Sequence, residues 1–118
     1  MNTTTLPFPL SPVAADVCVA GQLTPEAMAD AAAAGFRGVV NNRPDFEHGF
    51  DQPTNATIEA AARAAGLEYR FLPVDGRWQS PEQIAECARL LRELPRPLLL
   101  FCRSGARSAK LFQAAVGA

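Results

Sequence analysis

The sequence has few of the residues that build metal centres and disulfide frameworks. Its 118 residues include three cysteines and one histidine. Cys18, Cys87 and Cys102 are an odd number and form no close pair, and His48 stands apart from them. These spacings match neither a disulfide framework nor a set of metal ligands. We therefore expect no metal or other cofactor, and a reducing cytoplasmic location.

The sequence also lacks an excess of charge of one sign and a long hydrophobic run. The formal net charge is -1 and 19% of the residues are charged, with no basic stripe, so binding to nucleic acid has no electrostatic support. No apolar run approaches membrane-spanning length, and residues 1–12 lack the positive charge of a secretory signal. We expect one soluble domain over residues 1–118, with residues 1–12 as an extended lead-in.

Strand and helix patterns alternate along the chain. A capping residue precedes three of the helical segments, and in two of them proline and an acid follow it. Short apolar segments predict strands at 13–20, 38–41, 67–74 and 98–101, and the segments between them predict helices at 27–34, 56–65, 81–94 and 108–115. This alternation predicts a three-layer α/β/α fold around a mostly parallel four-stranded sheet.

The segment after the last predicted strand carries the strongest functional signal. Four apolar residues, 98–101, lead directly to Cys102, and small residues then lead into a helix. Such a turn directs backbone N–H groups toward one point at the positive end of the helix, where anions bind. A thiol there, beside Arg103 and Arg107, should be biased toward the nucleophilic thiolate. The alternative is that Cys102 is only a small buried hydrophobe, as we expect for Cys87 on the apolar face of the 81–94 helix.

The other residues of this loop would complete an anion-binding cradle. Ser104, Gly105, Ala106 and Ser108 are small enough for the backbone to approach a ligand closely. The two serine hydroxyls could either hydrogen-bond the thiolate or cap the helix. Arg107 opens the helix, and we expect it to hold the anion better than Arg103, which could face solvent.

Three loops should converge at the mouth of this site, because parallel strands end at one edge of a sheet. Asp75 follows the third strand and could protonate a leaving oxygen, or could simply form an Asp-Gly turn. Arg77 and Trp78 share its loop and could form the rim of the pocket, where Trp78 would act as a lid unless it packs on the core. Arg43 follows the second strand; it could face the anion or pair at the surface with Asp45 or Glu47, which we favour slightly. His48 is expected to be a loop residue.

Four segments resemble the beta-lactamase-hydrolase-like, phosphatase-like domain family: Gly21-Gln22-Leu23, Gly38 to Asp45, Pro73-Val74-Asp75 and Phe101 to Ser108. That family is related to dual-specificity tyrosine phosphatases and also occurs fused to persulfide dioxygenase and similar metallo-hydrolase domains. The resemblance implies a protein-tyrosine-phosphatase-like fold, with Cys102 as nucleophile, Arg107 as anion-binding arginine and Asp75 in the position of the general acid. It also implies a persulfide dioxygenase or metallo-hydrolase-like protein as a possible partner.

The length of the cysteine loop departs from the tyrosine phosphatases. Those enzymes place five residues between cysteine and arginine, whereas four separate Cys102 from Arg107. The shorter loop resembles that of rhodaneses, and a smaller cradle should suit a bound sulfur atom better than a tetrahedral phosphate. The rest of a rhodanese is missing: its Gly-His-Ile-Pro-Gly-Ala signature is absent, and a single helix follows the loop.

Three functions follow from these features. We expect most strongly a sulfurtransferase that works through a persulfide on Cys102, for which Asp75 is not required. The alternative is a phosphomonoester phosphatase with a phosphocysteine on Cys102 and Asp75 as general acid. The third is a non-catalytic domain that binds an oxyanion or sulfur for a partner. In each case the ligand is a small sulfur- or phosphate-containing molecule.

Overall fold

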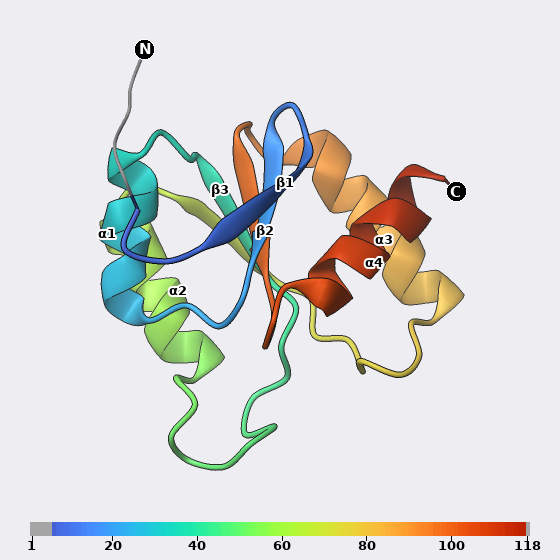
Figure 1. The fold of residues 1–118 in the computed structure, drawn as a ribbon, viewed down its shortest axis with the longest axis horizontal. Coiled ribbons are helices and arrows are strands. Elements are labelled where there is room, and N and C mark those ends of the chain that lie inside the picture. Colours follow the sequence, from blue (N-terminus) through green and yellow to red (C-terminus); the bar gives the residue numbers. More distant parts are fainter. Residues whose placement is uncertain (1–5, 118) are drawn as a thin grey trace.

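The structure, a computed structural model, describes residues 6–117 (Figure 1). Strands and helices alternate from residue 17 on, and all four predicted helices are present within a few residues of their expected bounds. The elements are β1 (Leu10–Ala14), β2 (Val17–Ala20), α1 (Pro25–Ala33), β3 (Gly38–Asn41), α2 (Asn55–Ala64), β4 (Glu68–Phe71), α3 (Pro81–Glu93), β5 (Leu98–Phe101) and α4 (Ala106–Val116).

The sheet has the strand order β1-β2-β5-β3-β4, which places β5 at its centre. β5 is parallel to both of its neighbours: Leu99 pairs with Cys18 of β2 and with Val39 of β3. β4 is parallel to β3, and β1 alone is antiparallel, paired with β2. This confirms the mostly parallel α/β sheet. The four apolar residues that predicted a fully buried strand are 0% exposed.

The predicted number of strands, four, was wrong, because the described residues form five. The expected first strand, 13–20, is a hairpin: a turn at Ala15 and Asp16 separates β1 from β2. β1 begins inside the expected lead-in, of which residues 1–5 lie outside the described part. Pro12 and the exposed side chains of β1 hid it from the sequence pattern. An edge strand tolerates proline because one of its sides needs no ladder hydrogen bonds.

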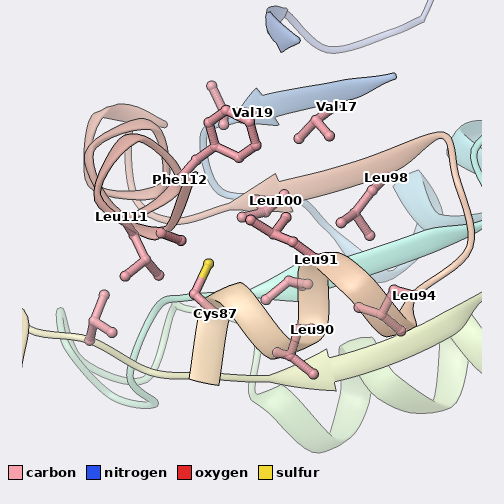
Figure 2. Packing of buried hydrophobic residues seen from close by; sticks show 13 residues of the cluster. Val17, Val19, Cys87, Leu90, Leu91, Leu94, Leu98, Leu100, Leu111 and Phe112 are labelled. Atoms are coloured by element: carbon pink, nitrogen blue, oxygen red, sulfur yellow. The ribbon is translucent and has the colours of Figure 1, made fainter. Parts of the chain in front are cut away.

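The helices form a layer on each face of the sheet, α1 and α2 on one and α3 and α4 on the other (Figure 1). Alternate residues of β5 point to opposite faces of the sheet, and each face has its own hydrophobic core. Leu99 and Phe101 pack with α1 and α2. Leu98 and Leu100 pack with α3 and α4, and Figure 2 shows Cys87 among these side chains. Burial raises the pKa of Cys87 to about 11, which suits a packing role.

Side-chain capping begins three of the helices. The hydroxyls of Thr24, Thr54 and Ser80 accept hydrogen bonds from backbone N–H groups of α1, α2 and α3, and Ser80 completes a capping box with Gln83. α4 differs, because its capping residue is Gly105, which has no side chain to offer. The first N–H groups of α4 are therefore available to another acceptor.

We expect Leu100→Ala to lower the free energy of unfolding by about 2–5 kcal/mol, because it leaves a cavity at a position that is 0% exposed between the sheet and α3 and α4. Urea unfolding followed by circular dichroism measures this. Val116→Ala, at a position 58% exposed, is the control and should change stability little. Equal effects of the two substitutions would contradict this account of the core.

Candidate active site

Cys102 lies directly after β5, with its side chain inside the loop that leads to α4. The residue is 1% exposed, and the backbone N–H of Gly105 donates a hydrogen bond to its Sγ over 3.1 Å. The N–H groups of Ser104 and Ser108 also act on this sulfur. The predicted arrangement, in which loop and helix N–H groups point at one atom, is therefore present, and that atom is the sulfur itself.

Burial by itself would raise the pKa of Cys102, because it disfavours the charged thiolate. Interactions with the backbone and hydroxyl of Ser108, and with the N–H groups of Ser104 and Gly105, outweigh it, so the pKa of Cys102 is lowered. The donors are thus backbone and serine groups rather than the two arginines that the sequence pointed to. A lowered pKa increases the fraction of nucleophilic thiolate at neutral pH.

The loop keeps this shape because Gly105 occupies a conformation that other residues rarely adopt. Its φ is 94°, in the left-handed region, and a Cβ there would lie 3.3 Å from the carbonyl carbon of Ala20. The turn after β2 supports the same loop, since the N–H of Gln22 donates to the carbonyl of Arg103 over 3.1 Å. A Cβ at Gly21 would also meet that carbonyl oxygen at 3.1 Å. Gly21 and Gln22, directly after β2, therefore hold the cysteine loop in this conformation.

Ser108 lies beside the thiol and does not cap α4. It is 0% exposed within the first turn of α4, and its hydroxyl donates to Oδ1 of Asn42 over 2.8 Å. Asn42 in turn donates to the carbonyl of Leu72 over 3.0 Å. This chain of hydrogen bonds ties the ends of β3 and β4 to the helix that carries the thiolate donors. Ser104 is exposed, and its hydroxyl accepts from the N–H of Ala106 over 3.4 Å.

The guanidinium group of Arg107 joins the three loops that the sequence predicted to converge. Its Nη1 donates to the carbonyl of Val74 over 3.1 Å. The carboxylate of Glu47 binds it with both oxygens: Oε2 lies 3.0 Å from Nη1, and Oε1 lies 3.2 Å from Nη2. Gly76 packs against it, since a Cβ there would lie 3.3 Å from Nε. That Nε is buried and has no hydrogen-bond partner among the described residues, so its N–H and the second N–H of Nη2 are the donors left for a ligand.

Glu47 is the site residue that sequence reasoning missed. Besides Arg107, it binds Arg43, whose Nε lies 2.9 Å from Oε1. Burial would raise the pKa of Glu47, but hydrogen bonds and charge attraction from Arg107 and Arg43 outweigh it and lower that pKa. The signal in the sequence was an arginine and an acid four residues apart in a polar loop, which also describes an ordinary surface pair.

Arg43 does pair with Glu47, as we favoured, but the pair is not at the surface. Arg43 is 6% exposed, and its Nη1 donates to Oε1 of Gln22 over 2.9 Å. Asn41 supports it from below by accepting the N–H of Arg43 over 2.9 Å. The buried guanidinium therefore holds Glu47 in place and links it to the turn behind the cysteine loop.

Asp75 lies in an exposed turn beside the site. Its Oδ1 accepts the N–H of Arg77 over 2.7 Å and lies 3.5 Å from Nε of the same residue. These hydrogen bonds, with the charges of Arg77 and Arg107, lower the pKa of Asp75. Asp75 therefore caps its own turn, as the turn interpretation expected, and it also lines the cleft beside Arg107 that does not contain Cys102; its role as an acid stays a prediction.

Arg107 lines two clefts, which also share Gly76 and Arg103. One, of about 280 Å³, contains the thiol and is lined by Gly76, Cys102, Arg103, Ser104, Ala106, Arg107 and Lys110. The other, of about 520 Å³, is lined by Glu47, His48, Asp75, Gly76, Arg77, Arg103 and Arg107. Trp78 is 67% exposed and lines neither, so it is not packed on the core and does not cover the thiol. His48 is a loop residue on the rim of the second cleft.

The family of this chain follows from comparison with known sequences. The sequence model of the family described as "Beta-lactamase hydrolase-like protein, phosphatase-like domain" matches residues 10–117. The chain belongs to this family. The beta-lactamase hydrolase-like protein of Xylella fastidiosa (strain Temecula1) is 34% identical over 96 residues, which are 81% of this chain and 22% of that protein. The chain thus spans about a fifth of the length of this relative.

Solved structures share the fold. A candidate phosphatase from Neisseria meningitidis Z2491 superimposes with a TM-score of 0.78 and 25% identity, over 86% of this chain and 72% of that one. The active form of Tk-PTP superimposes with a TM-score of 0.60 and 20% identity, over 91% of this chain and 80% of that one. The expected protein-tyrosine-phosphatase-like fold is confirmed. The similar structures support an enzyme of the hydrolase class.

The described residues contain no group of three or more histidine, cysteine or acidic side chains that could hold a metal ion. Among the helices described, none has the length and apolar character needed to cross a membrane.

We expect Ser108→Ala to raise the pKa of Cys102, because the Ser108 hydroxyl is one of the groups that lower that pKa. The rate of alkylation by iodoacetamide as a function of pH measures this. Ser104→Ala is the matched control: Ser104 acts on the sulfur through its backbone N–H, which alanine retains. Equal shifts in the two variants would show that the Ser108 hydroxyl does not act on the thiolate.

We expect Glu47→Gln to lower the free energy of unfolding at pH 7 by about 1–3 kcal/mol, because it removes the charge that pairs Arg43 and Arg107. The folded-state pKa of Glu47 is depressed, so its stabilisation is complete above the unfolded value of about 4.3 and is lost as pH falls through the folded value. Urea unfolding between pH 7 and pH 3 should show the difference from the parent protein shrink.

Glu59→Gln provides the control for this experiment, since Glu59 makes an exposed pair with Arg63 on α2. It should cost less than about 1 kcal/mol at pH 7. A Glu47→Gln difference that stays constant down to pH 3 would mean that the ionised carboxylate is not what stabilises the fold.

Proposed function

We propose that this domain hydrolyses phosphate monoesters through a phosphocysteine on Cys102. The observation that carries the proposal is a thiol of lowered pKa in a cleft with Arg107, which has unpartnered N–H groups on Nε and Nη2, on a fold shared with phosphatases. The thiolate supplies the nucleophile, and these N–H groups are the donors available to phosphate oxygens. The family and its solved neighbours support a hydrolase more than the sulfurtransferase that we had preferred.

The reaction has two displacements at phosphorus. In the first, the Cys102 thiolate forms a bond to phosphorus, the bond from phosphorus to the ester oxygen breaks, and that oxygen takes a proton from Asp75 or from water. In the second, water attacks the phosphocysteine, the bond from phosphorus to sulfur breaks, and inorganic phosphate and the thiolate are released. Arg107 and the loop N–H groups stabilise the charge on the phosphate oxygens in both steps.

The role of Asp75 as acid is limited by its ionisation. The hydrogen bonds from Arg77 lower the pKa of Asp75, so little of it is protonated at neutral pH. A leaving oxygen of high basicity needs that proton, whereas nitrophenolate does not. The ionised state of Asp75 should therefore limit the hydrolysis of alkyl phosphates more than that of nitrophenyl phosphate.

The sulfur-transfer hypothesis rests on the four-residue spacing between Cys102 and Arg107, and the comparisons do not support it. The position of the loop donors around the sulfur is compatible with either a persulfide or a phosphocysteine. Mass spectrometry of the intact protein separates the two after incubation with thiosulfate or with an aryl phosphate, by the mass of the group added. Partnership with a persulfide dioxygenase or metallo-hydrolase-like protein stays a prediction.

Steady-state turnover of p-nitrophenyl phosphate and glycerol phosphate tests the proposal. We expect Cys102→Ser to lower kcat for both substrates by at least about a thousandfold. Asp75→Asn should lower kcat for glycerol phosphate by roughly a hundredfold and affect p-nitrophenyl phosphate much less, because general acid catalysis matters most for the poorer leaving group. Asp16→Asn is the control. Asp16 lies in the turn between β1 and β2, and the substitution breaks only its exposed ion pair with Arg96.

Two results would contradict the proposal. One is turnover that survives Cys102→Ser, which would exclude a thiol nucleophile. The other is a parent protein that hydrolyses neither ester while gaining one sulfur atom from thiosulfate on Cys102, which would favour sulfur transfer.

A further inference from the structure

The two clefts beside Arg107 differ in charge. The cleft over the thiol is lined by three cations, Arg103, Arg107 and Lys110, and by no carboxylate. The second cleft shares Arg103 and Arg107 with the first and also contains Arg77, but there the carboxylates of Glu47 and Asp75 offset much of the positive charge. A second anionic group on a substrate would therefore be attracted more strongly to the first cleft than to the second.

Two of the three cations in the thiol cleft have no counterion. The side chains of Arg103 and Lys110 make no ion pair or hydrogen bond with any residue that the structure describes, whereas Arg107 is held by Glu47. In contrast, Arg77, on the rim of the other cleft, pairs with Asp75. Lys110 is also the single lysine of a chain whose net charge is -1. Arg37 and Arg92 also form no ion pair with a described residue, but neither lines the thiol cleft, so Arg103 and Lys110 are the unpaired cations beside Cys102.

The positions of these residues on α4 favour a shared ligand. Lys110 follows Arg107 by three residues, so the two side chains lie on one face of the helix, with about 5–6 Å between their Cβ atoms. Arg103 lies in the loop before the helix and lines the same cleft of about 280 Å³. A ligand whose first anionic group is held by Arg107 over the thiol would place an adjacent anionic group between Arg103 and Lys110.

We propose that Arg103 and Lys110 form a second anion subsite, which selects substrates in which the reacting phosphoryl group is bonded to a second phosphoryl group. This inference rests on the proposed function and names its substrate class as phosphoanhydrides. The Cys102 thiolate forms a bond to the terminal phosphorus, the bond from that phosphorus to the bridging oxygen breaks, and the remaining phosphate leaves with the electron pair. Water then hydrolyses the phosphocysteine to inorganic phosphate and regenerates the thiolate.

The ionised state of Asp75 agrees with this substrate class. A leaving phosphate is a weaker base than an alkoxide, so it departs without a proton from a protein acid. Arg103 and Lys110 would instead stabilise the negative charge that develops on it. The thiol cleft thus holds the groups that a phosphoanhydride needs.

Inorganic pyrophosphate and p-nitrophenyl phosphate are the two probes. For Lys110→Gln we expect kcat/KM to fall about tenfold with pyrophosphate, a loss of about 1.4 kcal/mol of binding to the transition state, and to stay within about twofold with p-nitrophenyl phosphate. Lys110→Arg should retain most of the pyrophosphate activity. Arg92→Gln, which removes an exposed positive charge from α3 outside both clefts, should change neither activity.

Calorimetric measurement of binding to the Cys102→Ser variant tests the subsite without turnover. Pyrophosphate should bind more tightly than phosphate, and Lys110→Gln in that background should remove most of the difference. If the parent protein hydrolyses no phosphate compound but this binding difference depends on Lys110, the proposed function fails and the subsite stands. If both probes are hydrolysed and Lys110→Gln affects them equally, or affects neither, the subsite is wrong and the phosphatase proposal stands.

Discussion

The set of hydrogen bonds that meets at the sulfur of Cys102 is the interaction on which the site depends. Burying a thiolate is unfavourable unless donors replace water, and the loop supplies them from Ser104, Gly105 and Ser108. The sheet makes this possible, because β5 lies at its centre and ends at Cys102 with neighbouring strands on both sides. The left-handed conformation of Gly105 then turns the chain so that its N–H points back at the sulfur.

A second network surrounds this centre and carries the positive charge. Arg107 reaches from α4 to the carbonyl of Val74 and to Glu47, and Glu47 is also held by the buried Arg43. The three loops that follow β3, β4 and β5 are therefore connected by charge-assisted hydrogen bonds, which are stronger than neutral ones. The bidentate pair also fixes the plane of the guanidinium and leaves its Nε unpartnered. Arg107 is thus oriented before any ligand arrives, which lowers the cost of binding.

Much of the fold could be predicted because its signals are local. Four consecutive apolar residues indicated the central strand, and Thr24, Thr54 and Ser80 indicated where three helices begin. β1 could not be predicted, since an exposed edge strand with Pro12 has neither an apolar run nor a clear alternation. It is stabilised by pairing with β2, which is an interaction between segments and is not visible within either of them.

The sequence by itself determined the order of strands and helices, the cysteine at the end of a buried strand, and the glycine and serine that follow it, because these depend on neighbouring residues along the chain. Only the tertiary structure decided which side chains surround that cysteine. Glu47 and Arg107 are 60 residues apart, and Ser108 and Asn42 are 66 apart, yet each pair is in contact. Such contacts form because parallel strands end at the same edge of the sheet and bring their loops together, and the spacing of residues along the chain does not encode which of them will meet there.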